Sequence, residues 1–321
     1  MKAEILVGDV RSRLAEIPDK SVQCVVTSPP YWGLRDYGND GQIGLEQTPQ
    51  EYIAEMVSVF REVWRVLSDD GVLWLNVGDS YYSTTRGTGG MNPETSPKNA
   101  IKGKANFQAF DPIKVNKGEL PLKPKDLVGI PWRLAFALQD DGWYLRQDII
   151  WAKPNPMPES VRDRCTKSHE YIFMLTKSSR YFFDNEAIKE PSANLGSTKI
   201  KFGGSKYGDS DDPKHATKSG NEYTDSGKRN KRDVWFIPTK PFKGAHFAVM
   251  PEAIVEPCVL ASSRPGDTVL DPFTGSGTVA VVALRHGRNY VGTELNPEYA
   301  DIAINRITEA VGGLINDVVL S

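Results

Sequence analysis

The feature that most constrains the fold is a glycine-rich turn between a strand pattern and a helix pattern. Residues 271–278 read DPFTGSGT, between the apolar run TVL and the helical pattern VAVVALRHG. Glycine lets a backbone turn tightly and lets a ligand approach the amino end of the following helix. Such a strand–loop–helix unit is typical of doubly wound α/β sheets, which bind ligands at the carboxyl ends of their strands.

The rest of the chain alternates strand and helix patterns, as a mostly parallel sheet requires. A capping box at Thr48 and a proline at position 49 mark the start of the clearest helix, which ends at Asp70–Gly71. The last two strands before residue 185 are expected to form an antiparallel edge. Predicted strands cover residues 4–9, 22–26, 72–79, 144–153, 170–184, 268–270 and 289–294, and predicted helices cover 10–17, 49–67, 127–143, 251–263, 279–287 and the stretch up to 307.

Two stretches lack this periodicity and interrupt the sheet pattern. The first, 83–119, is rich in Gly, Thr, Asn and Lys, and a loop of that length is functional or disordered. The second is basic: residues 191–232 hold nine Lys or Arg against five Asp or Glu. We therefore expect one α/β domain built from 1–190 and 245–321, with an insert at 191–244.

The overall composition is that of a globular protein without a membrane span. The 321 residues carry a formal net charge of −2 and include no apolar run of the roughly 20 residues that would cross a bilayer. The amino end lacks a signal-peptide pattern, so a cytoplasmic location is expected. The three cysteines are far apart and form no Cys-x-x-Cys pair, so neither a disulfide framework nor a metal site is expected.

The glycine-rich loop predicts a binding site for S-adenosylmethionine. Asp271 ends the strand before the loop, Gly275 and Gly277 lie within it, and Glu294 follows 23 positions after Asp271. That spacing lets a carboxylate reach a ribose hydroxyl pair. An acid at the strand end repels a pyrophosphate but suits an ammonium group, and S-adenosylmethionine has an ammonium, a ribose and no phosphate. A purely structural strand-to-helix turn is the alternative.

A second turn, TSPPYW at residues 27–32, fits the acceptor side of a methyl transfer. Two acceptors aimed at the hydrogens of an exocyclic amine favour a pyramidal nitrogen whose lone pair faces the methyl carbon. The Ser28 hydroxyl and the Pro29 carbonyl can supply them, since a Pro-Pro bend fixes the backbone and offers no N–H. Tyr31 can stack on a base flipped out of the duplex. Alone, this motif predicts only a turn that ends a strand.

Together these motifs make the sequence resemble the amino-methyltransferases of DNA, in the circularly permuted order called the beta group. The resemblance covers nearly the whole chain: TSPPYWGLRDYG resembles the family's catalytic motif and LDPFTGSGT its S-adenosylmethionine loop. It implies catalytic roles for Ser28, Pro29 and Tyr31. It implies cofactor contacts from Asp9, Asp271, Phe273, Gly275, Gly277, Glu294 and Asn296, and more loosely from His246 and Phe247.

The resemblance also implies the substrate. Serine at the first catalytic position resembles the cytosine-N4 enzymes, and aspartate there resembles the adenine-N6 enzymes, so Ser28 favours cytosine N4 and leaves adenine N6 as the alternative. The implied partner is double-stranded DNA. We expect segments 83–119 and 191–232 to contact it, with basic side chains on phosphates and other side chains on base edges. The basic cluster of the second segment is Lys228, Arg229, Lys231 and Arg232. An RNA methyltransferase and a non-catalytic DNA-binding protein are further alternatives. A cognate restriction endonuclease is compatible with this interpretation.

Two other polar positions have competing interpretations. The pair His169–Glu170 fits acid–base chemistry, but methyl transfer needs no strong base, so a histidine satisfied at the start of a strand is expected. Asp79, after the strand 72–79, lines the cleft or caps a turn.

Overall fold

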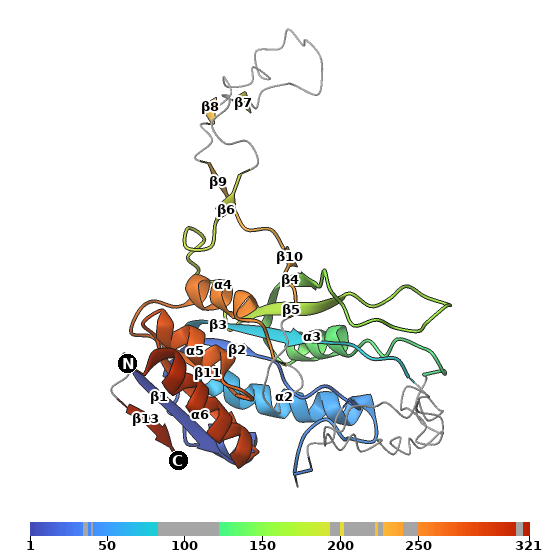
Figure 1. Ribbon diagram of the computed structural model, residues 1–321, viewed down its shortest axis with the longest axis horizontal. Helices are drawn as coiled ribbons and strands as arrows, with labels where there is room; N and C mark the ends of the chain where they lie inside the picture. Colours follow the sequence, from blue (N-terminus) through green and yellow to red (C-terminus); the bar gives the residue numbers. More distant parts are fainter. Residues whose placement is uncertain are drawn as a thin grey trace, which may run out of the picture. The chain divides into compact units, whose positions relative to one another are not determined.

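A nine-stranded, mostly parallel sheet organises the larger part of the protein. The computed structural model describes residues 1–34, 38–39, 41–82, 122–192, 200–201, 222–223, 227–239, 249–312 and 317–321. These divide into two compact units, Met1–Phe183 with Asp233–Ser321, and Asp184–Arg232. The sheet belongs to the first unit, in the order β10-β4-β5-β3-β2-β11-β12-β1-β13 (Figure 1). This arrangement confirms the predicted doubly wound α/β fold.

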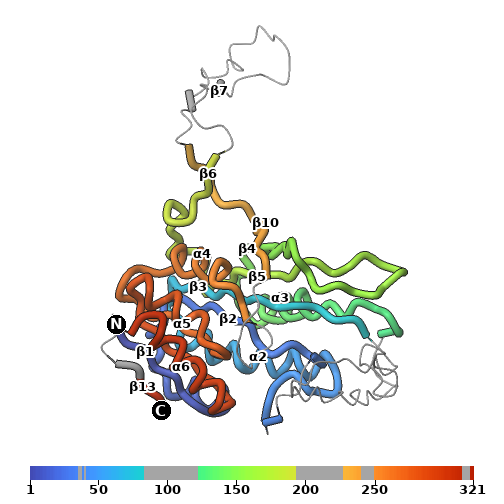
Figure 2. The backbone as a smooth tube through the Cα atoms, viewed as in Figure 1, coloured from blue at the N-terminus to red at the C-terminus, as the bar shows by residue number. Residues whose placement is uncertain are grey.

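Seven strands form the centre of the sheet, and β10 and β13 extend its two edges. Within this sheet, β5 alone runs antiparallel to its neighbours. Both ends of the chain lie at one edge, where β1 pairs in parallel with β13 (Figure 2). The strands are β1 (Lys2–Val7), β2 (Val22–Thr27), β3 (Leu67–Val77), β4 (Tyr144–Ala152), β5 (His169–Thr176), β10 (Val234–Phe236), β11 (Thr268–Asp271), β12 (Asn289–Glu294) and β13 (Asp317–Leu320).

Helices cover both faces of this sheet. One buried cluster joins α1, α2 and α3 to strand residues such as Val25, Leu73 and Leu75. On the other face, α4 packs against α5 and α5 against α6 (Figure 1). Trp74, next to Leu73 in the strand, points to that face and donates to Ser262 Oγ of α4 at 2.9 Å. The helices are α1 (Val10–Leu14), α2 (Pro49–Val66), α3 (Ile130–Asp140), α4 (Glu252–Ser262), α5 (Thr278–Arg285) and α6 (Pro297–Val311).

Local sequence signals set the clearest helix boundary and miss one strand boundary. The predicted capping box is present at the start of α2, where Thr48 Oγ1 accepts from Glu51 N and the Glu51 carboxylate accepts from Thr48 N. At the other end, β3 begins directly at Leu67, although the sequence predicts a turn at Asp70–Gly71. The register between β2 and β3 shifts there, so those turn residues form an irregularity within the strand.

The sheet direction gathers polar residues at one edge. β1, β2, β3, β11 and β12 are parallel, so their carboxyl ends lie together. Because β5 is antiparallel, its first residues reach the same edge. The connection that follows β2 passes over one face of the sheet and the connection that follows β11 passes over the other. Sheets of this type bind ligands at the point between two such strands.

The second unit, Asp184–Arg232, begins and ends earlier than the insert predicted at 191–244. It holds the short pairs β6 (Glu190–Pro191) with β9 (Lys228–Arg229), and β7 (Ile200–Lys201) with β8 (Glu222–Tyr223). The later part of the predicted insert contributes β10 to the main sheet instead, because Val234–Phe236 pair with β4. The predicted loop 83–119 lies outside the described residues. No helix of the described ranges is both long and apolar enough to cross a membrane.

Candidate active site

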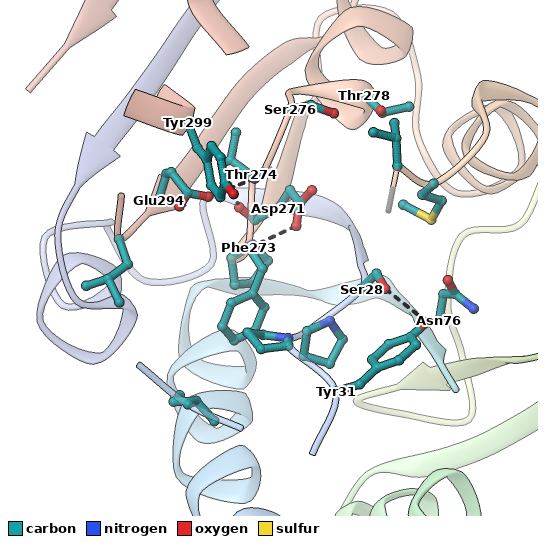
Figure 3. A pocket seen from close by; sticks show the side chains of 18 of the residues that line it. Ser28, Tyr31, Asn76, Asp271, Phe273, Thr274, Ser276, Thr278, Glu294 and Tyr299 are labelled. Atoms are coloured by element: carbon teal, nitrogen blue, oxygen red, sulfur yellow. Dashed lines mark hydrogen bonds between the residues drawn. The ribbon is translucent and has the colours of Figure 1, made fainter. Parts of the chain in front are cut away.

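A cavity of about 640 Å³ opens at the carboxyl edge of the sheet. Figure 3 shows Ser28, Tyr31 and Asn76 in one part of it and Asp271 and Glu294 in another. The cavity brings together most of the residues predicted from the two motifs. Those that line it are Asp9, Ser28, Pro29, Tyr31, Asp271, Phe273, Gly275, Glu294 and Asn296.

Asp271 joins the two halves of the site at the point where the connections change face. Its Oδ1 accepts from Thr27 Oγ1 at 2.7 Å, at the end of β2, and from Phe273 N at 3.0 Å. Only 3% of the residue is exposed. Burial raises the pKa of this carboxyl to about 7, and no cationic side chain of the described residues offsets that effect. A cationic group of a ligand would do so.

Glu294 holds the glycine-rich loop in place. Its Oε2 accepts from Gly275 N at 2.8 Å and its Oε1 from Asn296 N at 2.9 Å. Burial raises the pKa of this carboxyl too. Gly277 does not line the cavity; it caps α5 with φ +74°, and an added Cβ would lie 3.0 Å from Ala303 Cβ.

These residues fit the groups of S-adenosylmethionine. The buried, uncompensated carboxyl of Asp271 matches an ammonium, and a second carboxyl at the end of the adjacent strand matches a ribose. Asn296 and Phe273 border the same cavity. The Asn296 side chain also caps α6, because its Oδ1 accepts from Glu298 N at 2.9 Å.

The raised pKa of Asp271 predicts that cofactor affinity depends on pH. A cationic ligand favours the ionised carboxylate, which predominates above about pH 7 in the free protein. Below that value binding must displace a proton, so we expect affinity to fall by up to about tenfold per pH unit. Calorimetric titration from pH 8.5 to 5.5 measures this. Asp271→Asn should flatten the profile. Glu294→Gln removes a charge that helps to raise the pKa of Asp271, so it should move the slope to lower pH. A profile as steep in Asp271→Asn as in the wild type would contradict the assignment.

The turn at residues 28–31 is held rigidly from α2. Tyr52 is fully buried and donates its hydroxyl to the Pro30 carbonyl at 2.9 Å. Within the described part of the chain, no recorded hydrogen bond reaches the Pro29 carbonyl. Pro29 and Ser28 both line the cavity.

Tyr31 lies between this turn and the start of β5. Its hydroxyl donates to Glu170 Oε2 at 2.7 Å and accepts a long hydrogen bond, 3.4 Å, from Ser28 Oγ. Its ring lies against the backbone of Gly78, where an added Cβ would come within 2.6 Å of Tyr31 Cε2. Burial, reinforced by the charge of Glu170, raises the pKa of the Tyr31 phenol well above its usual value.

Sequence reasoning misses two residues near Tyr31, Asn76 and Lys153, and names a third, Glu170, only beside His169. Glu170, Lys153 and Asn76 line the cavity, and Lys153 and Asn76 both contact the Glu170 carboxylate that accepts from the Tyr31 hydroxyl. From the sequence, Glu170 is considered only together with His169. The sequence signal that could have identified it is an acidic residue at the start of a strand expected to be antiparallel. His169 itself is exposed. Asp79 proves to be a cap: its Oδ1 accepts from Gly129 N and Ile130 N before α3.

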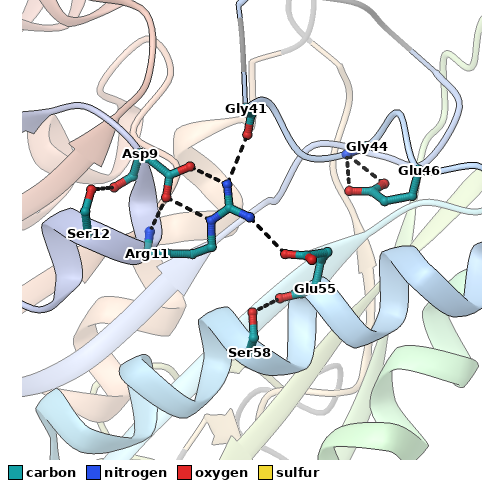
Figure 4. Close-up of polar contacts among 8 residues, drawn as sticks. All are labelled: Asp9, Arg11, Ser12, Gly41, Gly44, Glu46, Glu55 and Ser58. Carbon is teal, nitrogen blue, oxygen red and sulfur yellow. Dashed lines mark hydrogen bonds and ion pairs between the residues drawn. The ribbon is translucent and has the colours of Figure 1, made fainter.

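Asp9 borders the cavity but is already bonded to Arg11. Its Oδ1 accepts from Arg11 N and Nε, and its Oδ2 from Arg11 Nη2 at 2.5 Å. This guanidinium lowers the pKa of the Asp9 carboxyl. Arg11 also reaches Glu55 of α2 and the carbonyl of Gly41 (Figure 4). Asp9 therefore adds less uncompensated charge to the cavity than Asp271.

The predicted DNA-binding cluster belongs to the second unit. Arg229 and Arg232 both bond Glu190 Oε1, at 2.9 and 2.6 Å. Lys228 and Arg232 are exposed. His246 and Phe247 lie outside the described residues.

Comparison with known proteins is consistent with this site. Residues 22–305 match the family described as DNA methylase. Over 307 residues the chain is 50% identical to the type II methyltransferase M.Cfr9I of Citrobacter freundii, covering 95% of this chain and 87% of that one. It is also 50% identical over 304 residues to the type II methyltransferase M.SmaI of Serratia marcescens, with 95% and 90% covered.

Solved structures share the architecture. The putative DNA modification methylase TTHA0409 of Thermus thermophilus, solved in complex with S-adenosylmethionine, is 25% identical with a TM-score of 0.60, covering 99% of this chain and 97% of that one. The PvuII DNA methyltransferase, described as cytosine-N4-specific, is 17% identical with a TM-score of 0.61, covering 100% and 95%. The second likeness concerns the fold alone.

Proposed function

The chain belongs to the DNA methylase family, and on that premise we propose that it transfers a methyl group from S-adenosylmethionine to the N4 amine of cytosine at a specific DNA site. The bound cofactor supplies an electrophilic methyl group. The observation that carries the choice of cytosine is Ser28: a residue with a neutral hydroxyl, rather than a carboxylate, precedes Pro29 in the turn that lines the cavity. Adenine N6 is the alternative.

The neighbours of Ser28 support its role as an acceptor. Its hydroxyl hydrogen points to Tyr31, so the lone pairs of Oγ are available to an incoming amine hydrogen. The Pro29 carbonyl supplies the second acceptor, in a backbone that Tyr52 holds through Pro30. Holding the amine and the methyl carbon at about 3–3.5 Å removes much of the entropic barrier.

The cofactor half of the proposal rests on charge and shape. We assign Asp271 to the ammonium group, Glu294 to the ribose, and Phe273 and Asn296 to the adenine end. Gly275 provides backbone beside the ligand, and Gly277 allows the turn into α5. Asp9 is assigned to the adenine amine, with Arg11 fixing the direction of its carboxylate.

DNA contact is assigned to the basic residues of the second unit, Lys228, Arg229, Lys231 and Arg232. Such residues bind phosphates without reading sequence. The target base must leave the helix to reach the cavity, at a cost of a few kcal/mol. The named relatives are type II methyltransferases, which supports a cognate endonuclease that recognises the same DNA site.

Nucleoside analysis tests this function. The protein is incubated with duplex DNA and methyl-labelled cofactor, the DNA is digested, and the nucleosides are separated by mass spectrometry. We expect the label in N4-methylcytosine. Label in N6-methyladenine would support the alternative base, and label in neither would exclude an amino-methyltransferase of DNA.

A further inference from the structure

We propose that Glu170 is a positioning residue that fixes the hydrogen-bond direction of Tyr31 and Ser28, so that Ser28 presents lone pairs to the target amine. This inference rests on the proposed transfer to an exocyclic amine, but it holds for either base. The feature that carries it is a convergence of three donors on one carboxylate in the cavity wall. One donor lies in the turn after β2, one near the end of β3 and one directly after β4.

Glu170 acts only as a hydrogen-bond acceptor here, because three donors face its carboxylate. Tyr31 donates to Oε2 at 2.7 Å, Asn76 Nδ2 donates to the same atom at 3.2 Å, and Lys153 forms an ion pair with Oε1. Only 14% of the Glu170 side chain and 18% of the Lys153 side chain are exposed. An ionised carboxylate only accepts hydrogen bonds, so it satisfies all three donors together.

The orientation of Asn76 is independently fixed. Its Nδ2 also donates to the Tyr171 carbonyl at 3.1 Å, so both neighbours of that atom are acceptors. The amide cannot turn its oxygen toward Glu170 without facing two acceptors. Asn76 therefore presents an N–H to Glu170 Oε2, and this oxygen stays an acceptor for the Tyr31 hydroxyl.

The direction then passes through Tyr31 to the catalytic serine. Since the phenol gives its hydrogen to Glu170, its oxygen can accept the hydrogen of Ser28, 3.4 Å away. A serine that donates to Tyr31 has only lone pairs left for a substrate. If Tyr31 donated to Ser28 instead, the serine hydrogen would no longer be directed to Tyr31 and could face the amine, where an acceptor is needed.

Glutamine at position 170 would break this order while keeping the shape. Its amide has one acceptor oxygen and one donor nitrogen. The cationic Lys153 attracts the oxygen to the Oε1 position, so the N–H group is left at the Oε2 position, facing both Tyr31 and Asn76. With duplex DNA and saturating cofactor, we expect E170Q to lower the single-turnover rate roughly 10- to 100-fold. Cofactor affinity, measured by calorimetry, should stay within about twofold because Glu170 lies away from the residues assigned to the cofactor.

A double-mutant cycle with Y31F separates positioning from general structural support. Phenylalanine keeps the ring and removes the relay, so E170Q should add little to the loss in Y31F. Multiplicative losses, or a wild-type rate in E170Q, would overturn the proposal. K153M keeps the acceptor for Tyr31 and should lose clearly less activity than E170Q. An equal or larger loss in K153M would assign the effect to the ion pair and would also overturn it.

The readout is total label in N4-methylcytosine and N6-methyladenine. Failure of the cytosine assignment would appear as a wild-type product of the other kind, with the cycle intact. Failure of the Glu170 proposal would appear as multiplicative losses in the double-mutant cycle, or as a wild-type rate in E170Q, while the wild-type product stays N4-methylcytosine.

Discussion

Asp271→Ala is expected to weaken S-adenosylmethionine binding by about 100-fold or more. Removing one member of a buried charged pair costs about 2–5 kcal/mol, and the ligand's ammonium would lose its only assigned carboxylate. Alanine would also release Thr27 Oγ1 and Phe273 N, which both donate to Asp271 Oδ1. Calorimetric titration of the cofactor at pH 8 measures the effect. An affinity within threefold of wild type would contradict the assignment of this carboxylate.

Asp271→Asn is the matched control because it keeps the shape and one acceptor oxygen. The pKa of Asp271 rises from 3.8 to about 7 on burial, so its ionised form is disfavoured in the folded, ligand-free protein. Its cost to stability therefore grows as pH rises from about 4 to 7 and is fully present above that. We expect the asparagine variant to melt at a higher temperature than wild type at pH 8 without cofactor, yet to bind the cofactor poorly. A lower melting temperature would show that the carboxylate contributes to folding rather than to binding.

The cofactor half of the site was predictable because its signals are local in sequence. Strand, glycine-rich loop and helix follow one another in residues 268–285, and the acid that bonds the loop lies at the end of the next strand. Parallel order then requires both carboxylates to lie at the same edge. The bond from Thr27 to Asp271 spans 244 positions, and no local pattern contains it.

The support of the turn at residues 28–31 was less predictable because it depends on one strand's direction. Glu170 reaches the site only because β5 runs against β3, which brings its first residues to the carboxyl edge. An antiparallel pair was expected, but β10 lies outside it and makes β4 an interior strand. Nothing in the local sequence distinguishes Asn76 or Lys153 from other polar residues at strand ends. Their role is visible only in the folded structure, where both contact the Glu170 carboxylate.

Ser28→Ala is expected to lower the single-turnover rate of methyl transfer about 100-fold. The variant removes one of the two acceptors assigned to the amine hydrogens and leaves the Pro29 carbonyl, and losing one preorganised polar contact in a transition state costs about that factor. Rapid-quench assays with saturating cofactor and DNA isolate this step. Because Ser28 is not assigned to the cofactor, the cofactor dissociation constant should be unchanged.

The control for Ser28→Ala is Ser58→Ala, which also removes one serine hydroxyl. The Ser58 hydroxyl lies on α2 and donates to the backbone carbonyl of Glu55. Ser58 does not line the cavity, and its loss should leave the rate within twofold of wild type. Residual activity in Ser28→Ala is informative in its own right. With the serine gone, the hydrogen-bond direction set by Glu170 no longer reaches the amine, so adding E170Q should lower the rate little further. An unchanged rate in Ser28→Ala would transfer the whole acceptor role to the Pro29 carbonyl, and the choice of cytosine would lose its support.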